Sequence, residues 1–196
     1  KQAAKEFAEG GIGAGTGMSC YKLKGGIGSA SRVFDIDGNK HTLGVLVLSN
    51  MGRLSELVVK GRPLGQEIRS KIRHEQLNPD SRDMGSIIVI IATDVPLSAR
   101  QLERVARRGE VGIARTGNTI GHGSGEIALA FSTSQYIHHY EKQDTISIHI
   151  LNEERIELLF QAVAEATEEA VLNSMVTAET THGIAGHKRE SLRQYL

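Results

Sequence analysis

The chain has 196 residues, which is enough for one domain with a substantial core. Its 23 basic residues balance 23 acidic ones, and aromatic residues make up only 4%, so a nucleic-acid-binding surface is not expected. The single cysteine excludes an internal disulfide framework, and the longest apolar runs are far shorter than the roughly 20 residues of a membrane span.

The N-terminal stretch KQAAKEFAEG is charged and amphipathic, without the apolar centre of a signal peptide. Together with the single cysteine, this predicts a cytoplasmic protein without a membrane partner. Residues 2–9 read as the end of a helix that Gly10 and Gly11 terminate. Because the chain begins with Lys1 inside this pattern, we expect the sequence to be a fragment of a longer protein.

The first half of the chain predicts mainly short strands. Residues 18–26 (MSCYKLKGG) and 55–61 (SELVVKG) are short strand candidates, and residues 31–50 predict a hairpin that turns at Asp37 and Gly38. Residues 61–85 are polar and contain two prolines, so they predict a long exposed loop with a helical turn at 66–75. Loops of this length in compact domains are usually functional.

The second half predicts strands that alternate with helices. An apolar run predicts a central strand from Ser86 to Asp94, and Ser98 opens a helix with Gln101 completing a capping box. Gly109 is expected to end that helix. Two further strands are predicted at 125–133 and 144–151.

The longest predicted helix covers residues 153–177, with Asn152 as its cap. Its apolar face recurs at spacings of three and four residues: Ile156, Leu159, Phe160, Val163, Thr167, Ala170, Val171 and Ser174. The elements together predict an α/β (α+β) fold in which helices are layered on a mainly antiparallel sheet.

Glycine is abundant, with 22 residues, and is concentrated near the N-terminus. The run from Gly11 to Gly17 (GIGAGTG) has neither the dinucleotide-binding spacing nor a phosphate-loop lysine, so it favours a conformational role. The eight histidines show no zinc-ligand spacing, which gives no reason to expect a metal site. No cofactor is predicted.

Two serines are candidates for chemistry. Ser124, in GHGSGE, lacks the spacing of a hydrolase nucleophile elbow, but Glu126 would lie on the same side of an extended segment. Such a hydroxyl–carboxylate pair could position an amine. Taken alone, the stretch is more simply a glycine-rich turn that leads into a strand.

Ser86 follows Gly85, and this order is compatible with self-cleavage. The unshielded glycine carbonyl can be attacked by the serine hydroxyl in an N→O acyl shift, and hydrolysis of the ester frees Ser86 with a new α-amine. That amine has an unperturbed pKa of about 7.7–8.0, so it could act as a base for its own hydroxyl. The Gly-Ser dipeptide alone is too common in proteins to establish self-cleavage.

Five segments, in order, closely resemble the self-processing aminopeptidases of the DmpA/BapA type, which include L-aminopeptidase/D-esterases and β-peptidyl aminopeptidases. They are residues 10–32, 43–52, 85–118 (GSIIVIIATDVPLSARQLERVARRGEVGIARTGN), 121–133 (GHGSGEIALAFST) and 169–180. The resemblance implies a four-layer α-β-β-α sandwich of the N-terminal-nucleophile type, with the topology of the ornithine acetyltransferases. Family precursors carry a long segment upstream of the glycine run, which this sequence lacks.

The resemblance also implies roles for individual residues. The chain would be one domain that cuts itself between Gly85 and Ser86, giving parts 1–85 and 86–196, with Ser86 as nucleophile and its α-amine as base. Ser124 and Glu126 would bind that amine, and the Asn50 side chain would donate to the oxyanion. The implied substrates are short peptides, amino-acid amides or esters, and the implied assembly is a homotetramer of processed protomers. Whether α-, β- or D-amino acids are preferred stays open.

Two alternatives remain at the level of the sequence. One is an acyltransferase of the ornithine acetyltransferase type, although that family uses threonine as its nucleophile. The other is a non-catalytic domain that keeps the fold.

Overall fold

The computed structural model describes residues 4, 6–71 and 85–196. Its centre is a four-stranded sheet in the order β3-β4-β5-β6, formed by Gly26–Ile36, Asn39–Asn50, Ser86–Thr93 and Gly125–Ser132. Strand β4 runs antiparallel to both of its neighbours, β3 and β5, whereas β6 runs parallel to β5. The predicted hairpin is confirmed: Asp37 and Gly38 adopt the positive φ that its tight turn requires.

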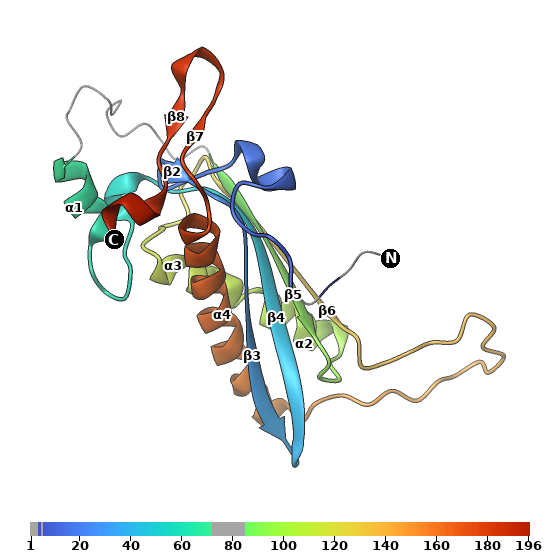
Figure 1. Cartoon of the computed structure of the whole chain (residues 1–196). Coiled ribbons are helices and arrows are strands. Elements are labelled where there is room, and N and C mark those ends of the chain that lie inside the picture. The colour runs from blue at the N-terminus through green and yellow to red at the C-terminus, as the bar shows by residue number, and fades with distance from the viewer. Residues whose placement is uncertain (1–3, 5, 72–84) are drawn as a thin grey trace.

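The helices cover one face of this sheet (Figure 1). Helix α4 (Glu157–Val176) lies along β3 and β4, α2 (Ala99–Ala106) contacts β6, and α3 (Gly109–Arg115) packs on α4. The predicted apolar face of α4 is buried, except for the partly exposed Phe160. Opposite it lie the buried side chains of the two central strands: Leu43, Val45, Val47, Ile87, Val89 and Ile91.

The other face of the sheet carries apolar side chains that no described helix covers. On β6, Ile127, Leu129 and Phe131 are 58%, 59% and 46% exposed. The described residues therefore form two layers, one of helices and one sheet, of the mixed α/β architecture.

Smaller elements complete the described chain. These are the 3₁₀ turns Gly13–Gly17, Leu54–Glu56, Glu153–Arg155, Ile184–Gly186 and Leu192–Tyr195, helix α1 (Leu64–Lys71), and the two-stranded pairs β1 (Ser19–Cys20) with β2 (Leu23–Lys24) and β7 (Thr181–His182) with β8 (Lys188–Arg189). No helix among the described residues is long and apolar enough to cross a membrane.

Five secondary-structure predictions are wrong. The strand expected at 18–26 is a small hairpin, because Tyr21 and Lys22 turn the chain with positive φ. Residues 55–61 begin in a 3₁₀ turn and make only an isolated bridge between Val59 and Arg62. The helix that Ser98 opens ends at Ala106, and Gly109 begins α3 instead of ending that helix. Described residues 4 and 6–9 form no helix.

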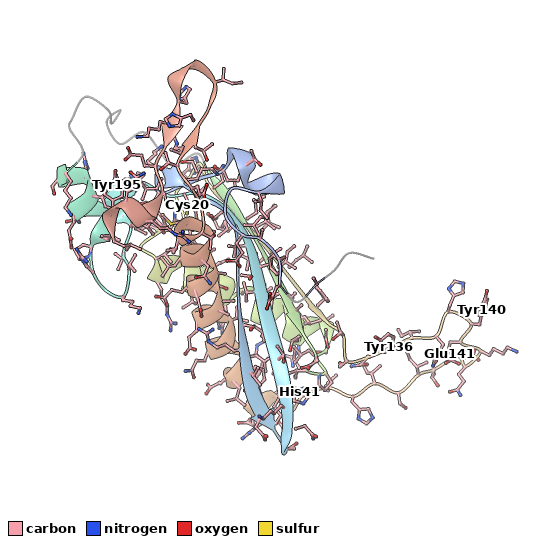
Figure 2. The ribbon with its side chains drawn as sticks, in the orientation of Figure 1. Cys20, His41, Tyr136, Tyr140, Glu141 and Tyr195 are labelled. Atoms are coloured by element: carbon pink, nitrogen blue, oxygen red, sulfur yellow. The ribbon has the colours of Figure 1, made fainter. Side chains whose placement is uncertain are left out.

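The fifth error is the strand expected at 144–151. Described residues 144–150 belong to an extended arm that projects away from the sheet, with Tyr136 along the arm and Tyr140 and Glu141 near its tip (Figures 1 and 2). Ile146, Ile148 and Ile150 alternate with polar residues as predicted, but all three are exposed. Alternation identifies the face of a strand, whereas a strand also needs a neighbour for its backbone hydrogen bonds.

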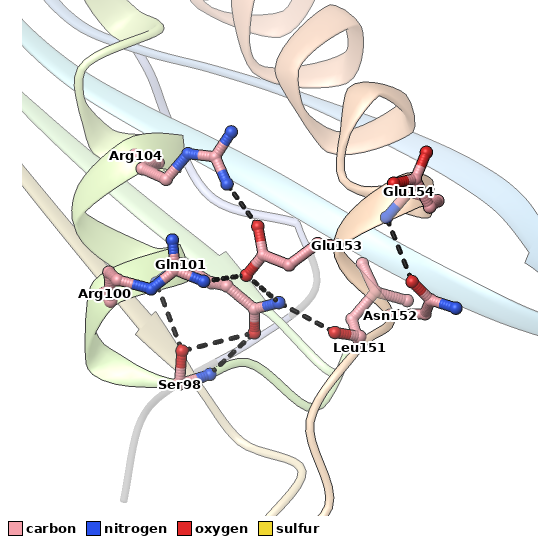
Figure 3. Close-up of polar contacts among 8 residues, drawn as sticks. All are labelled: Ser98, Arg100, Gln101, Arg104, Leu151, Asn152, Glu153 and Glu154. Carbon is pink, nitrogen blue, oxygen red and sulfur yellow. Dashed lines mark hydrogen bonds and ion pairs between the residues drawn. The ribbon is translucent and has the colours of Figure 1, made fainter.

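The predicted capping box of α2 is confirmed and extends into a larger polar network (Figure 3). The Ser98 backbone N–H donates to Gln101 Oε1 at 3.0 Å, and Gln101 Nε2 donates to the Leu151 carbonyl at 2.7 Å. Arg100 and Arg104 both pair with Glu153. This network joins the start of α2 to the turn before α4, where Asn152 caps the 3₁₀ turn by accepting from the Glu154 N–H.

Replacing the fully buried Gln101 by methionine is expected to destabilise the protein by about 2–4 kcal/mol, because the Ser98 N–H and the Leu151 carbonyl lose their partner. Urea unfolding measures the effect. The matched control is Gln161→Met on the exposed side of α4, which should change stability by less than about 0.5 kcal/mol. Equal effects of the two substitutions would contradict the assigned role of the network.

Candidate active site

The strand register brings two predicted site residues, Asn50 and Ser86, into one row with Gly125 at the end of the sheet. Asn50, the last residue of β4, pairs with Ser86, the first residue of β5, and Ser86 pairs with Gly125, the first residue of β6. Residues that face each other across neighbouring strands point to the same side of a sheet. The Asn50 and Ser86 side chains therefore project from the same face.

Ser86 is exposed, and its hydroxyl donates to the Gly85 carbonyl oxygen at 2.8 Å. The hydroxyl thus lies against the bond that the sequence suggests as scissile. Gly125 lies directly beside it, since a Cβ at that position would be in van der Waals contact with Ser86 Oγ at 3.5 Å. A side chain at Gly85 is excluded, because its Cβ would lie 2.1 Å from the Asn50 carbonyl oxygen.

Ser124 and Glu126 form the contact that the sequence predicts. Ser124 Oγ donates to Glu126 Oε1 at 2.7 Å, and both residues are half-buried. Glu126 is opposite Ile87 in the sheet, so its side chain points to the face opposite that of Ser86. Among the described residues, no hydrogen bond joins Ser86 to this pair. A contact with the Ser86 α-amine requires that amine to exist, and in the continuous chain it is a peptide nitrogen.

Asn50 is held by the segment that follows the glycine run. The Ser19 backbone N–H donates to Asn50 Oδ1 at 3.0 Å. Since the side-chain oxygen is engaged on this side, the NH₂ group is the part of the amide that can donate toward a bound substrate. This is the group that an oxyanion would need.

The glycine run has the conformational role that the sequence predicts. The 3₁₀ turn Gly13–Gly17 is part of it, and a Cβ on Gly15 would lie 2.4 Å from the Gly10 carbonyl oxygen. Gly26, on the neighbouring strand, has φ +148°. A Cβ on Gly26 would lie 1.9 Å from the Gly10 carbonyl oxygen. Glycine is therefore required for the loop to lie directly against the start of β3.

Sequence reasoning missed Lys24, which is only 2% exposed. Its ammonium group donates to three backbone carbonyls, those of Gly15, Met18 and Gly25, at 2.8, 2.9 and 2.8 Å. Burial lowers the pKa of Lys24 below its usual value. The only signal in the sequence was a lysine between a buried leucine and two glycines, which is equally typical of a surface turn.

Metal-ligating side chains do not cluster in the part of the chain that the structure describes: no group of three or more His, Cys, Asp or Glu residues is placed to hold an ion. Three residues shortly before the predicted cleavage site lie outside the described residues: Arg82, Asp83 and Met84. So does His74, and so does most of the loop predicted at 61–85, apart from its first part, which forms α1.

The sequence pattern of peptidase family S58 matches residues 1–189. The chain is also 38% identical over 199 aligned residues to the β-peptidyl aminopeptidase BapA of Sphingosinicella microcystinivorans, covering 97% of this chain and 50% of that protein. The chain therefore belongs to peptidase family S58, the family of the DmpA/BapA-type aminopeptidases that its motifs resemble.

Solved structures agree on the fold. The PH0078 protein from Pyrococcus horikoshii OT3 superposes with a TM-score of 0.86 at 50% identity, over 96% of this chain and 50% of that one. The L-aminopeptidase D-Ala-esterase/amidase from Ochrobactrum anthropi, described as a variant of the Ntn hydrolase fold, gives a TM-score of 0.84 at 36% identity, over 98% and 54%. The fold class expected from the sequence is confirmed. The chain spans about half the length of the relatives it matches.

Proposed function

We propose that this protein is a serine aminopeptidase that activates itself by cutting the Gly85–Ser86 bond and then uses Ser86 as its nucleophile. The observation that carries the proposal is the placement of the Ser86 hydroxyl against the Gly85 carbonyl, in one row with Asn50. The family of the chain and the aminopeptidases among its relatives support it.

The cleavage step begins with attack of Ser86 Oγ on the Gly85 carbonyl carbon. A C–O bond forms, the peptide C–N bond breaks, and the hydroxyl proton is transferred to the nitrogen, which becomes the α-amine of Ser86. Water then hydrolyses the ester and leaves a carboxylate on Gly85. The new amine lies at the start of β5, beside the strand that carries Glu126.

The catalytic cycle uses the same atoms on an external substrate. Ser86 Oγ attacks the carbonyl of the substrate's first residue while the Ser86 α-amine takes the proton. The Asn50 NH₂ stabilises the oxyanion, the leaving amine or alcohol is protonated and departs, and water releases the acyl group. Peptides, amino-acid amides and esters with a free amino end are the proposed substrates, and processed protomers are proposed to assemble as a homotetramer.

Mass spectrometry combined with an aminopeptidase assay tests the proposal. One fragment should end at Gly85 and another should begin at Ser86, and the cleaved protein should release p-nitroaniline from amino-acid p-nitroanilides. An intact chain with full activity would contradict self-processing. Cleaved protein that only transfers acetyl groups from acetylornithine to glutamate would favour the acyltransferase, and protein without either activity would favour a non-catalytic domain.

The pH profile tests the role of the α-amine. We expect kcat/KM of the cleaved protein to rise with pH and to level off above an apparent pKa that lies higher than the unperturbed amine value of about 7.7–8.0, because only the neutral amine can take a proton. Glu126→Gln removes a carboxylate that favours the ammonium form, so the apparent pKa should fall. An unchanged pKa in this variant would show that Glu126 does not act on the amine.

A further inference from the structure

Lys24 is a buried cation whose environment contains backbone dipoles instead of a counter-ion. Its three acceptors are the carbonyls of Gly15, Met18 and Gly25, and no carboxylate pairs with it among the described residues. Removing an ammonium group from water is costly unless its hydrogen bonds are replaced. An apolar residue at position 24 would avoid this desolvation cost. Packing alone therefore does not explain why a charged side chain is buried there.

One of the three carbonyls connects Lys24 to Asn50. The Met18 C=O accepts from Lys24 Nζ, and the N–H of the same peptide unit, that of Ser19, donates to Asn50 Oδ1. In a planar trans peptide the C=O and the N–H point in opposite directions. The Met18–Ser19 peptide is therefore held between the ammonium group on one side and the Asn50 side chain on the other.

This arrangement acts on Asn50 in two ways. It fixes the orientation of the peptide, and with it the position of the N–H that binds Oδ1. The positive charge at the Met18 oxygen also polarises the peptide and makes its N–H a stronger donor, as expected for hydrogen bonds in series. With Oδ1 held, the NH₂ of Asn50 has one orientation, on the side of the sheet from which Ser86 projects.

We propose that Lys24 is a positioning residue for Asn50, acting through the Met18–Ser19 peptide to aim the Asn50 NH₂ at the oxyanion. The inference rests on the proposed function of Asn50. If Lys24 has this role, the segment that follows the glycine run contributes to transition-state stabilisation as well as to the shape of the loop.

The kinetic test is a double-mutant cycle of Lys24→Met with Asn50→Ala. Rates are divided by the fraction of chains that mass spectrometry shows to be cleaved. Lys24→Met alone should lower kcat about tenfold or more with little change in KM, because the lost interaction acts in the transition state. In the Asn50→Ala background the same substitution should lower kcat less than twofold. An equal loss in both backgrounds would overturn the proposal, because a general loosening of the fold does not depend on Asn50.

A matched control and a second variant keep the test decisive. Lys22→Met, on the exposed neighbour two residues away, should leave kcat within twofold. If Lys24→Met does not fold, Lys24→Gln, which retains a donor, replaces it in the cycle with the same expected coupling.

Amide hydrogen exchange separates this proposal from the proposed function. In Lys24→Met the Ser19 amide should exchange at least about tenfold faster, while the Val47 amide in the middle of β4 keeps its wild-type rate. Unchanged exchange at Ser19 would overturn the role of Lys24 whatever the activity. Faster exchange at Ser19 in a protein that hydrolyses no amide would leave the connection standing and refute the aminopeptidase.

Discussion

Ser86→Ala is expected to leave the chain uncut at Gly85 and to abolish amide hydrolysis, lowering kcat/KM by roughly 10⁴-fold or more. Both effects have the same cause, because the hydroxyl that lies 2.8 Å from the Gly85 carbonyl oxygen is the attacking group in both reactions. Mass spectrometry of the purified protein and p-nitroanilide hydrolysis measure them on the same sample.

Ser70→Ala provides the matched control, since Ser70 is an exposed serine on α1, a helix that contributes no residue to the proposed site. This variant should be cut and active like the wild type. Hydrolysis by Ser86→Ala at more than a few per cent of the wild-type rate would rule out Ser86 as the nucleophile. Cleavage at Gly85 in that variant would instead point to another protease.

Asn50→Ala is expected to lower kcat about 10²–10³-fold, corresponding to ~2.7–4 kcal/mol of lost oxyanion stabilisation, with a much smaller change in KM. The Ser19 N–H also loses its acceptor, which should reduce the free energy of unfolding by about 1 kcal/mol. Steady-state kinetics on cleaved protein and urea unfolding separate the two effects.

The same strand supplies the control for this substitution. Asn39 is exposed at the opposite end of β4, beside the hairpin turn, and Asn39→Ala should leave kcat within twofold. A loss in KM alone for Asn50→Ala would assign Asn50 to substrate binding rather than to the oxyanion.

Much of the fold could be predicted from local patterns. Asp37 and Gly38 impose a turn that needs no long-range information, the capping box at Ser98 is complete within four residues, and the apolar stripe of α4 repeats over five turns. The errors arose where tertiary contacts, and not local sequence, determine the secondary structure. Helix α3 contains two glycines, which disfavour a helix, but Gly112 lets it approach α4 so closely that a Cβ there would lie 2.5 Å from Thr167 Cβ.

The candidate site was predicted from separate motifs, and the strand register explains why they belong together. Asn50, Ser86 and Gly125 are distant in sequence, and only the pairing of β4 with β5 and of β5 with β6 makes them neighbours. The family resemblance supplied this association where spacing could not. Lys24 was not predicted, because its importance depends on three carbonyls whose positions follow from the path of a glycine-rich loop.

The sheet order has a consequence for what cleavage would leave behind. Strands β3 and β4 precede Gly85, whereas β5, β6 and α4 follow it, and the ladder from Leu43–Thr93 to Asn50–Ser86 crosses this boundary. After a cut, the buried centre of the domain becomes an interface between two polypeptides. Folding as one chain would then be a unimolecular event, but refolding of the separated parts would be bimolecular. The cleaved protein would stay assembled because its two polypeptides dissociate slowly, and not because separated polypeptides reassociate easily.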